Sequence, residues 1–121
     1  MTRIMLVDDD RTTVKLLQTL LELDGYEVST VPRGLDVLSK MEQTCPDIVL
    51  MDYHLSDVEG DKVVRDLRRV PAFAQIPVVI TSGMDVEREA MQAGASSFLL
   101  KPFEPEELPE LFTRLLTTKP S

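Results

Sequence analysis

Five short runs of apolar or β-branched residues recur along the chain, and most of them do not alternate with polar positions. They are Ile4–Val7, Val28–Val31, Ile48–Met51, Pro77–Thr81 and Ser97–Leu100. Such runs are typical of strands buried on both faces of a parallel sheet. Each is followed by a segment with helical spacing of apolar residues: Leu17, Leu20 and Leu21; Leu35, Leu38 and Met41; Val63, Val64 and Leu67; Val86, Ala90 and Met91; Leu108, Leu111, Phe112 and Leu115.

This alternation predicts a doubly wound, three-layer α/β domain with right-handed crossovers, whose ligands gather at the carboxyl ends of the strands. Turn residues support the boundaries: Gly25, Gly34, Pro71 and Gly94. We expect one domain over residues 1–121, ordered to about residue 117.

The last helix and the end of the chain carry separate expectations. Pro105 suits the first turn of a helix, but Pro109 would remove a backbone donor inside it. We therefore expect that helix to start irregularly or late. The tail from Thr118 to Ser121 is expected to fray.

Composition narrows the classes of function. The chain has 121 residues, 43% of them hydrophobic, and a net charge of −8 from 13 basic and 21 acidic residues. This excess of acid disfavours direct binding to nucleic acid or to an anionic membrane surface. No apolar run approaches membrane-spanning length, and acidic residues begin too early for a signal peptide.

Cys45 is the only cysteine in the sequence, which excludes an internal disulfide and a multi-thiolate zinc site. The simplest setting is a reducing cytoplasm, and we expect the thiol to be buried and inert.

Acidic residues mark two strand ends. Asp8, Asp9 and Asp10 follow the first strand and Asp52 follows the third, so the topology brings their carboxylates together. Two carboxylates about 4 Å apart repel by roughly 4 kcal/mol at an effective dielectric constant near 20. Mg²⁺, which prefers carboxylate and water ligands, would remove that cost. A solvated turn is the alternative for the aspartate run alone, and we expect Asp10 to cap the next helix.

Thr81 ends the fourth strand and Lys101 follows the fifth, adding a hydroxyl and an ammonium to the same edge. Metal and lysine neutralise phosphoryl oxygens, while hydroxyl and backbone N–H groups fix geometry. Asp52 would then be the nucleophile that forms an acyl phosphate. Taken singly, Thr81 and Lys101 have ordinary interpretations as a structural residue and a surface charge, so their joint placement is the evidence.

Several blocks occur in the order and near the spacing of a known family. They are Leu6-Val7-Asp8-Asp9-Asp10, Asp47-Ile48-Val49-Leu50-Met51-Asp52, Asp57-Val58-Glu59-Gly60, Val79-Ile80-Thr81-Ser82, Ala93-Gly94-Ala95 and Phe98-Leu99-Leu100-Lys101-Pro102-Phe103. Across essentially its whole length the chain resembles the response-regulator receiver domain of two-component signalling. The resemblance implies a flavodoxin-like (βα)5 fold with strand order 2-1-3-4-5. It also implies that a sensor histidine kinase or a histidine phosphotransfer protein phosphorylates the chain.

The resemblance implies a role for each residue of the site. Asp52 is the phospho-acceptor, and Asp9, Asp52 and the backbone carbonyl of His54 ligate Mg²⁺, with Mn²⁺ as a possible substitute. Asp8 assists mainly through water. Lys101 bonds to the phosphoryl group.

Three further features are implied by the resemblance. The backbone N–H of Ser82 would bind the phosphoryl group. The switch would couple Thr81 to the aromatic ring of Phe98, whose missing hydroxyl lowers the cost of an inward rotamer and weakens the on/off contrast. The peptide bond between Lys101 and Pro102 is expected to be cis.

The chain departs from the family pattern in places. Ser56 stands where the family usually has proline, which predicts a more mobile loop. The segment from Thr81 to Gly94 is slightly short, so the fourth helix should be truncated or partly unwound, which puts the usual output and dimer face in doubt. The side chain of His54 would border the path of the attacking water; simple exposure is the competing interpretation.

Two alternatives remain open: a receiver that binds partners without phosphorylation, and a Mg²⁺-dependent phosphohydrolase with an aspartyl nucleophile. The second needs an acidic residue at the position of His54 and a cap domain. The leading interpretation is a non-enzymatic signalling module that catalyses only its own phosphorylation and dephosphorylation. Its partners would be a downstream protein target, an output domain or a second copy of the chain.

Overall fold

A computed structural model describes residues 1–117 of the chain. The expected frayed tail, Thr118–Ser121, lies outside the described residues. Strands and α-helices alternate over the described range, with a short 3-10 turn before the second helix. Among these helices, none is both long and apolar enough to cross a membrane.

The elements follow the order predicted from the hydrophobic pattern. The strands are β1 (Arg3–Val7), β2 (Glu27–Val31), β3 (Ile48–Asp52), β4 (Val78–Ser82) and β5 (Ser97–Leu100). The helices are α1 (Arg11–Leu23), η1 (Gly34–Asp36, the 3-10 turn), α2 (Val37–Thr44), α3 (Gly60–Arg68), α4 (Glu87–Ala93) and α5 (Glu107–Thr117).

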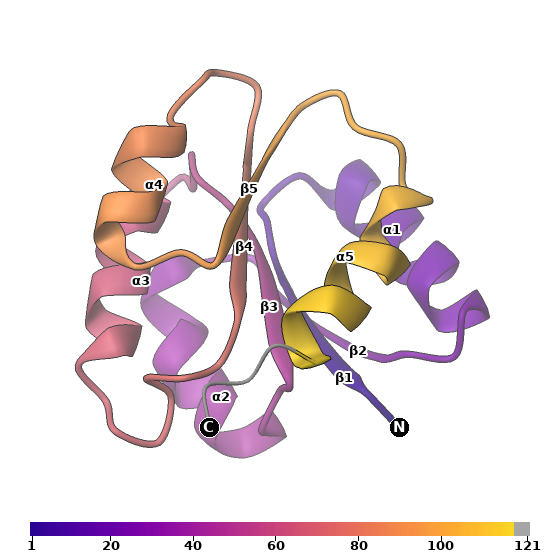
Figure 1. The fold of residues 1–121 in the computed structure, drawn as a ribbon, viewed down its shortest axis with the longest axis horizontal. Helices are drawn as coiled ribbons and strands as arrows, with labels where there is room; N and C mark the ends of the chain where they lie inside the picture. The colour runs from indigo at the N-terminus through magenta and orange to yellow at the C-terminus, as the bar shows by residue number, and fades with distance from the viewer. Residues whose placement is uncertain (118–121) are drawn as a thin grey trace.

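The strands form one parallel sheet in the order β2-β1-β3-β4-β5. This confirms the doubly wound (βα)5 fold and the strand order 2-1-3-4-5. Figure 1 shows the sheet nearly edge-on, with α2, α3 and α4 covering one face and α1 and α5 covering the other.

Each central strand sends side chains into both layers of the core. On β1, Met5 packs in the cluster that faces α2, α3 and α4, whereas Ile4 packs in the cluster that faces α1 and α5. On β3, Met51 and Leu50 divide in the same way. Complete burial of such a side chain contributes about 1.5–3 kcal/mol. The absence of alternation in these strands therefore reflects burial on both faces.

The last helix starts late, as Pro109 predicted. α5 begins at Glu107, which places Pro109 in its first turn, where a backbone N–H has no carbonyl partner within the helix. Leu108, Leu111 and Phe112 then bury one face. The spacing of these three residues is that of an amphipathic helix.

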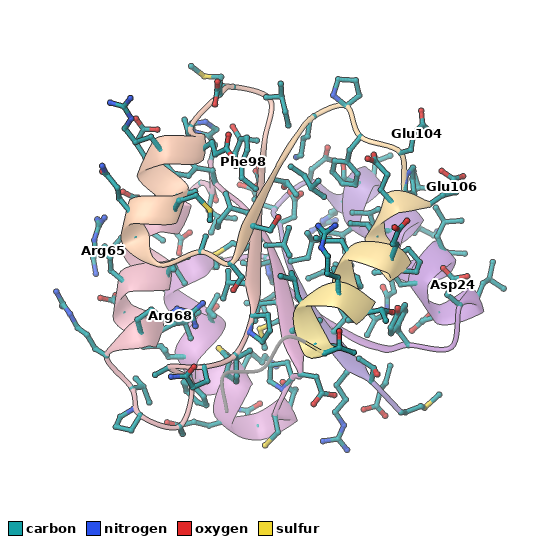
Figure 2. All side chains as sticks on the ribbon, viewed as in Figure 1. Asp24, Arg65, Arg68, Phe98, Glu104 and Glu106 are labelled. Atoms are coloured by element: carbon teal, nitrogen blue, oxygen red, sulfur yellow. The ribbon has the colours of Figure 1, made fainter. Side chains whose placement is uncertain are left out.

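The fourth helix is short, as expected. α4 has seven residues and is followed by the cap residue Gly94, whose φ of 113° is left-handed. The guanidinium of Arg68 donates a hydrogen bond from Nε to the carbonyl of Gly94 at 2.9 Å and another to that of Ile76 at 2.7 Å. Burial lowers the pKa of Arg68. Figure 2 shows this arginine at the lower end of α3, from which it fixes the start of the α4–β5 connection.

Two expectations near α2 are wrong. Leu35 lies in the 3-10 turn and its side chain is 64% exposed, because the α-helix begins only at Val37. Cys45 is exposed rather than buried. It ends α2 in a left-handed conformation with a φ of 48°, which turns its side chain away from the core.

Candidate functional site

The sequence-predicted site residues meet at the carboxyl edge of the sheet. Asp8 directly follows β1 and lies near Asp52, the last residue of β3, because these strands are neighbours. Thr81 pairs with Asp52 in the register between β3 and β4, and Lys101 directly follows β5. In Figure 1 this edge is at the top, where the chain leaves β4 and β5.

Three carboxylates form a compact cluster at this edge. Each of Asp8, Asp9 and Asp52 has an oxygen within 4.8 Å of those of the other two. The side chains of Asp8 and Asp52 are only 11% and 12% exposed. Burial raises the pKa of Asp8, and the charges of Asp52 and Asp9 act in the same direction. A hydrogen bond from the N–H of Asp10 to Oδ1 of Asp8, at 2.9 Å, works against that rise.

The ammonium of Lys101 reaches into this cluster. Its Nζ lies 3.4 Å from Oδ1 of Asp52 and 3.7 Å from Oδ2 of Asp8. The backbone N–H of Lys101 donates to the carbonyl of Ser82 at 2.7 Å, which continues the pairing beyond β5. The peptide bond between Lys101 and Pro102 is cis, as predicted. The cluster thus combines an ammonium with an excess of carboxylate.

The donor set of the cluster fits a hard divalent cation. All three groups offer oxygen, which Mg²⁺ and Mn²⁺ prefer over nitrogen or sulfur. Their separation suits binding through one or two carboxylates, with water and further oxygen completing the shell. A cation here would also offset the mutual repulsion of the carboxylates.

Thr81 and Ser82 are buried at the end of β4, with exposed fractions of 4% and 0%. The carbonyl of Thr81 accepts a hydrogen bond from the N–H of Tyr53 at 2.9 Å, which ties the residue after Asp52 to β4. The hydroxyl oxygen of Ser82 accepts one from the N–H of Met84 at 3.0 Å. The structure therefore brings Thr81 and Ser82 to the carboxyl edge at the end of a fully buried strand.

The side chain of Asp10 caps α1. Its Oδ1 accepts a hydrogen bond from the N–H of Thr12 at 3.1 Å, and its Oδ2 accepts one from the hydroxyl of Thr13 at 2.8 Å. The bond from Thr13, with that from Thr12, lowers the pKa of Asp10. This confirms its assignment as the helix cap.

His54 lies in the β3–α3 loop, residues 53–59. Its side chain is 43% exposed, and Nδ1 lies 3.5 Å from Oε2 of Glu59. An isolated antiparallel bridge joins the same two residues. The ring also meets that of Tyr53 edge to face, with centroids 4.9 Å apart. This exposure agrees with the interpretation that the side chain of His54 is simply exposed to solvent, the alternative being that it borders the path of the attacking water.

Phe98 lies on β5, opposite Ile80 and one register position before the partner of Thr81. Its side chain is half-buried against the cluster under α2, α3 and α4. Figure 2 labels it on the α4 side of the sheet. The residue is close along the sheet to Thr81, and its coupling to Thr81 stays a prediction.

Sequence reasoning missed the residues that hold the β3–α3 loop. The carboxylate of Asp57 accepts hydrogen bonds from the N–H groups of Gly34 and Leu35, at 3.0 and 2.9 Å. An aspartate after Ser56, in a segment expected to be a loop, was the available signal, because aspartates in turns often accept backbone hydrogen bonds. Its partners, 23 and 22 residues away in the sequence, could not be read from local pattern.

Comparison with known proteins finds a matching family and several relatives. Residues 4–113 match the model of the response regulator receiver domain. Over 105 residues the chain is 37% identical to the response regulator PleD of Caulobacter vibrioides. The aligned region covers 84% of the chain but only 23% of PleD. The chain spans about half the length of other curated relatives, among them the Haemophilus influenzae CpxR homolog.

Solved structures show the same fold at similar length. A putative response regulator from Chloroflexus aurantiacus superposes with a TM-score of 0.90 at 29% identity, covering 96% of this chain and 98% of that one. The receiver domain of the Pseudomonas aeruginosa sensor histidine kinase PA1611 gives a TM-score of 0.88 at 27% identity, covering 97% and 98%. That structure carries a magnesium ion coordinated in its active site cleft.

Proposed function

The chain belongs to the response regulator receiver domain family of two-component signalling, and we propose that it accepts a phosphoryl group on the carboxylate of Asp52. The donor would be a sensor histidine kinase or a histidine phosphotransfer protein. The fold is that of a signalling module rather than of a dedicated enzyme family. Phosphorylation would therefore serve as a signal, and the only reactions catalysed would be gain and loss of the phosphoryl group.

One observation carries the proposal: the carboxylate of Asp52 lies among Asp8, Asp9 and Lys101 at the carboxyl edge of the sheet. An oxygen of Asp52 would attack phosphorus and form a new P–O bond. The bond from phosphorus to the donor nitrogen would break, and the histidine would leave with that electron pair. The product is an acyl phosphate.

Asp8, Asp9 and Asp52, with the backbone carbonyl of His54, would hold Mg²⁺, or Mn²⁺ in its place. When bound, the ion supplies positive charge that neutralises phosphoryl oxygens. Asp9 and Asp52 would ligate directly, whereas Asp8 would act mainly through water. The fit of the carboxylate cluster to a hard cation supports this assignment.

Lys101 would supply a second positive charge to the phosphoryl oxygens. In the structure its Nζ lies 3.4 Å from Asp52, so an incoming phosphoryl group would meet it without a large movement. The hydroxyl of Thr81 and the backbone N–H of Ser82, both at the end of β4, would donate hydrogen bonds. The ammonium of Lys101 and the N–H of Ser82, both in place before the reaction, would lower the barrier because little reorganisation remains.

The conformational response would pass from Thr81 to Phe98. Thr81 would move toward the phosphoryl group, and the half-buried ring of Phe98 on the next strand would follow into the space vacated. The changed surface would act on a downstream protein target, on an output domain, or on a second copy of the chain. This chain spans only part of PleD and of the CpxR homolog, so the rest of each relative is long enough for further domains.

The test supplies a small acyl-phosphate donor with Mg²⁺ and measures label that is released by base and by hydroxylamine. Wild-type protein should take up such label and Asp52→Asn should take up none. Asp47→Asn is the matched control, because Asp47 flanks the opposite end of β3 and accepts a hydrogen bond from the N–H of Arg3. Equal labelling of Asp52→Asn would overturn the assignment. No labelling of wild type would favour a receiver that acts without phosphorylation.

A further inference from the structure

The middle of the β3–α3 loop is bound to a distant turn through a residue with no part in the proposed chemistry. Oδ1 of Asp57 accepts a hydrogen bond from the N–H of Gly34 at 3.0 Å, and Oδ2 accepts one from the N–H of Leu35 at 2.9 Å. The side chain of Asp57 is only 14% exposed. Nε of Arg33 lies 3.9 Å from the same carboxylate, a longer and more exposed contact. The two N–H groups are therefore the main partners.

Close packing reinforces these hydrogen bonds. Gly34 is buried, and a Cβ atom built on it would lie 2.3 Å from Cγ1 of Val58 and 3.0 Å from Cδ1 of Leu55. Both of those residues belong to the β3–α3 loop. A side chain at position 34 would therefore force side chains of the loop to move.

The two hydrogen bonds that Asp57 accepts from Gly34 and Leu35, here called the anchor, act in the middle of the loop. The ends of the loop are fixed by the hydrogen bond from the N–H of Gly60 to the carbonyl of Tyr53, at 2.6 Å, and by the bridge between His54 and Glu59. Between them stands Ser56, which presets the backbone less than a proline would. The hydrogen bonds that Asp57 accepts from the distant turn at Gly34 supply a restraint that the local backbone lacks.

Building on the proposed metal site, we propose that Asp57 is a positioning residue for metal binding. By fixing the loop to the turn at Gly34, it holds the backbone carbonyl of His54 where a cation shared with Asp9 and Asp52 needs it. Loss of the anchor allows the loop to sample other positions. The binding-competent fraction then falls, and the apparent affinity for Mg²⁺ falls in proportion.

The test compares Asp57→Ala with Asp47→Ala in the full chain. Asp47 is a matched control, since its Oδ2 also accepts a backbone hydrogen bond, from the N–H of Arg3 at 2.8 Å, but at the opposite edge of the sheet. The dissociation constant of Mg²⁺ is measured by calorimetry, and amide hydrogen exchange is followed without metal.

For Asp57→Ala we expect exchange at Gly34, Leu35 and the loop amides to accelerate about tenfold. The Mg²⁺ dissociation constant should rise about tenfold, at the low end of what outer partners of metal ligands contribute. Asp57→Asn keeps one acceptor oxygen and should fall between wild type and Asp57→Ala. Asp47→Ala should leave the Mg²⁺ dissociation constant unchanged.

A second pair of variants tests the packing without removing a charge. Gly34→Ala should displace Val58 and weaken Mg²⁺ binding, and Val58→Ala in the same chain should restore part of the affinity. An unchanged Mg²⁺ affinity in both Asp57→Ala and Gly34→Ala would overturn this inference while leaving the proposed function intact. Failure of the wild-type protein to bind Mg²⁺ would overturn the metal site and the inference together.

Discussion

At the amino edge of the sheet, the guanidinium of Arg3 pairs with Glu27 at 2.8 Å, and the backbone N–H of Arg3 donates a hydrogen bond to the carboxylate of Asp47, also at 2.8 Å. At the carboxyl edge, Lys101 faces Asp8 and Asp52 at 3.7 and 3.4 Å, with Asp9 beside them. The contacts of the first edge are short and its ion pair is half-exposed, whereas those of the second are longer and its acids are mostly buried.

The difference shows where the chain accepts an unfavourable arrangement of charge. At the amino edge each carboxylate lies close to an ion-pair partner or a hydrogen-bond donor, so these contacts stabilise the fold. At the carboxyl edge, carboxylates exceed the ammonium that faces them, and burial raises the pKa of Asp8. That edge is suited to gaining positive charge from outside, and without it the ligand-free protein bears the cost of the repulsion.

The largest expected effect comes from removing the ammonium of the carboxyl edge. Lys101→Met should lower the initial rate of labelling by the acyl-phosphate donor about 100-fold or more, because it deletes a preorganised charge at the phosphoryl oxygens. Arg3→Met removes the corresponding cation of the amino edge and should leave the rate unchanged. Similar rates for Lys101→Met and wild type would show that the ammonium of Lys101 does not contribute to labelling.

Addition of Mg²⁺ should stabilise the protein through the carboxyl edge. At a concentration about 100 times the dissociation constant, the free energy of unfolding should rise by about 2.7 kcal/mol. Urea denaturation at matched ionic strength measures this rise. Asp52→Asn should lose most of it and Asp47→Asn should keep it. An equal rise in both variants would place the ion elsewhere.

The same substitution should have opposite signs at the two edges in buffer with a chelator. Asp9→Asn relieves repulsion within the cluster and should raise the free energy of unfolding by up to about 1 kcal/mol. Asp47→Asn weakens a charge-assisted hydrogen bond and should lower it by about 1 kcal/mol. Denaturant titrations measure both. Destabilisation by Asp9→Asn under these conditions would show that the cluster is not strained.

The smallest expected effect concerns the pH dependence of stability that comes from Asp57. This acid lies near the carboxyl edge, and each of its carboxylate oxygens accepts a backbone hydrogen bond. Burial acts to raise its pKa, but hydrogen bonds from the N–H groups of Leu35 and Gly34, together with its own N–H and the charge of Arg33, outweigh burial, so the pKa lies below its ordinary value of 3.8. The ionised carboxylate therefore stabilises the fold above that value, and this contribution disappears as pH falls through the lowered pKa.

Urea titrations of wild type and Asp57→Asn across acidic pH measure this linkage. The difference in free energy of unfolding should be largest near neutral pH and should shrink below pH 3.8. A difference that stayed constant through the acid range would mean that ionisation of Asp57 contributes nothing.

Much of the fold followed from the sequence because the central strands β1, β3 and β4 are buried on both faces. Runs such as Ile48–Met51 need no alternation when helices cover the whole sheet, and this marked them as parallel strands. The cap at Asp10 and the late start of α5 followed from local chemistry that depends on few neighbours. The acids of the candidate site followed from the rule that parallel strands end at a common edge.

The remaining features depend on contacts that local pattern does not encode. Cys45 is exposed because α2 ends on it in a left-handed conformation, and a lone cysteine gives no sign of where a helix will end. The anchor at Asp57 requires the turn at Gly34 to lie beside a loop that is distant in the sequence. Contacts of this kind become visible only when the layers are assembled.

The exposed thiol of Cys45 has a practical consequence for work with the protein. α2 runs back along the sheet and ends at the amino edge, so this cysteine lies at the opposite end from the acidic cluster (Figure 1). Because the sequence contains one cysteine, a maleimide would couple at a single point without engineering. Protein tethered to a sensor chip in this way would present Asp52 outward, in one orientation, to a partner flowing past.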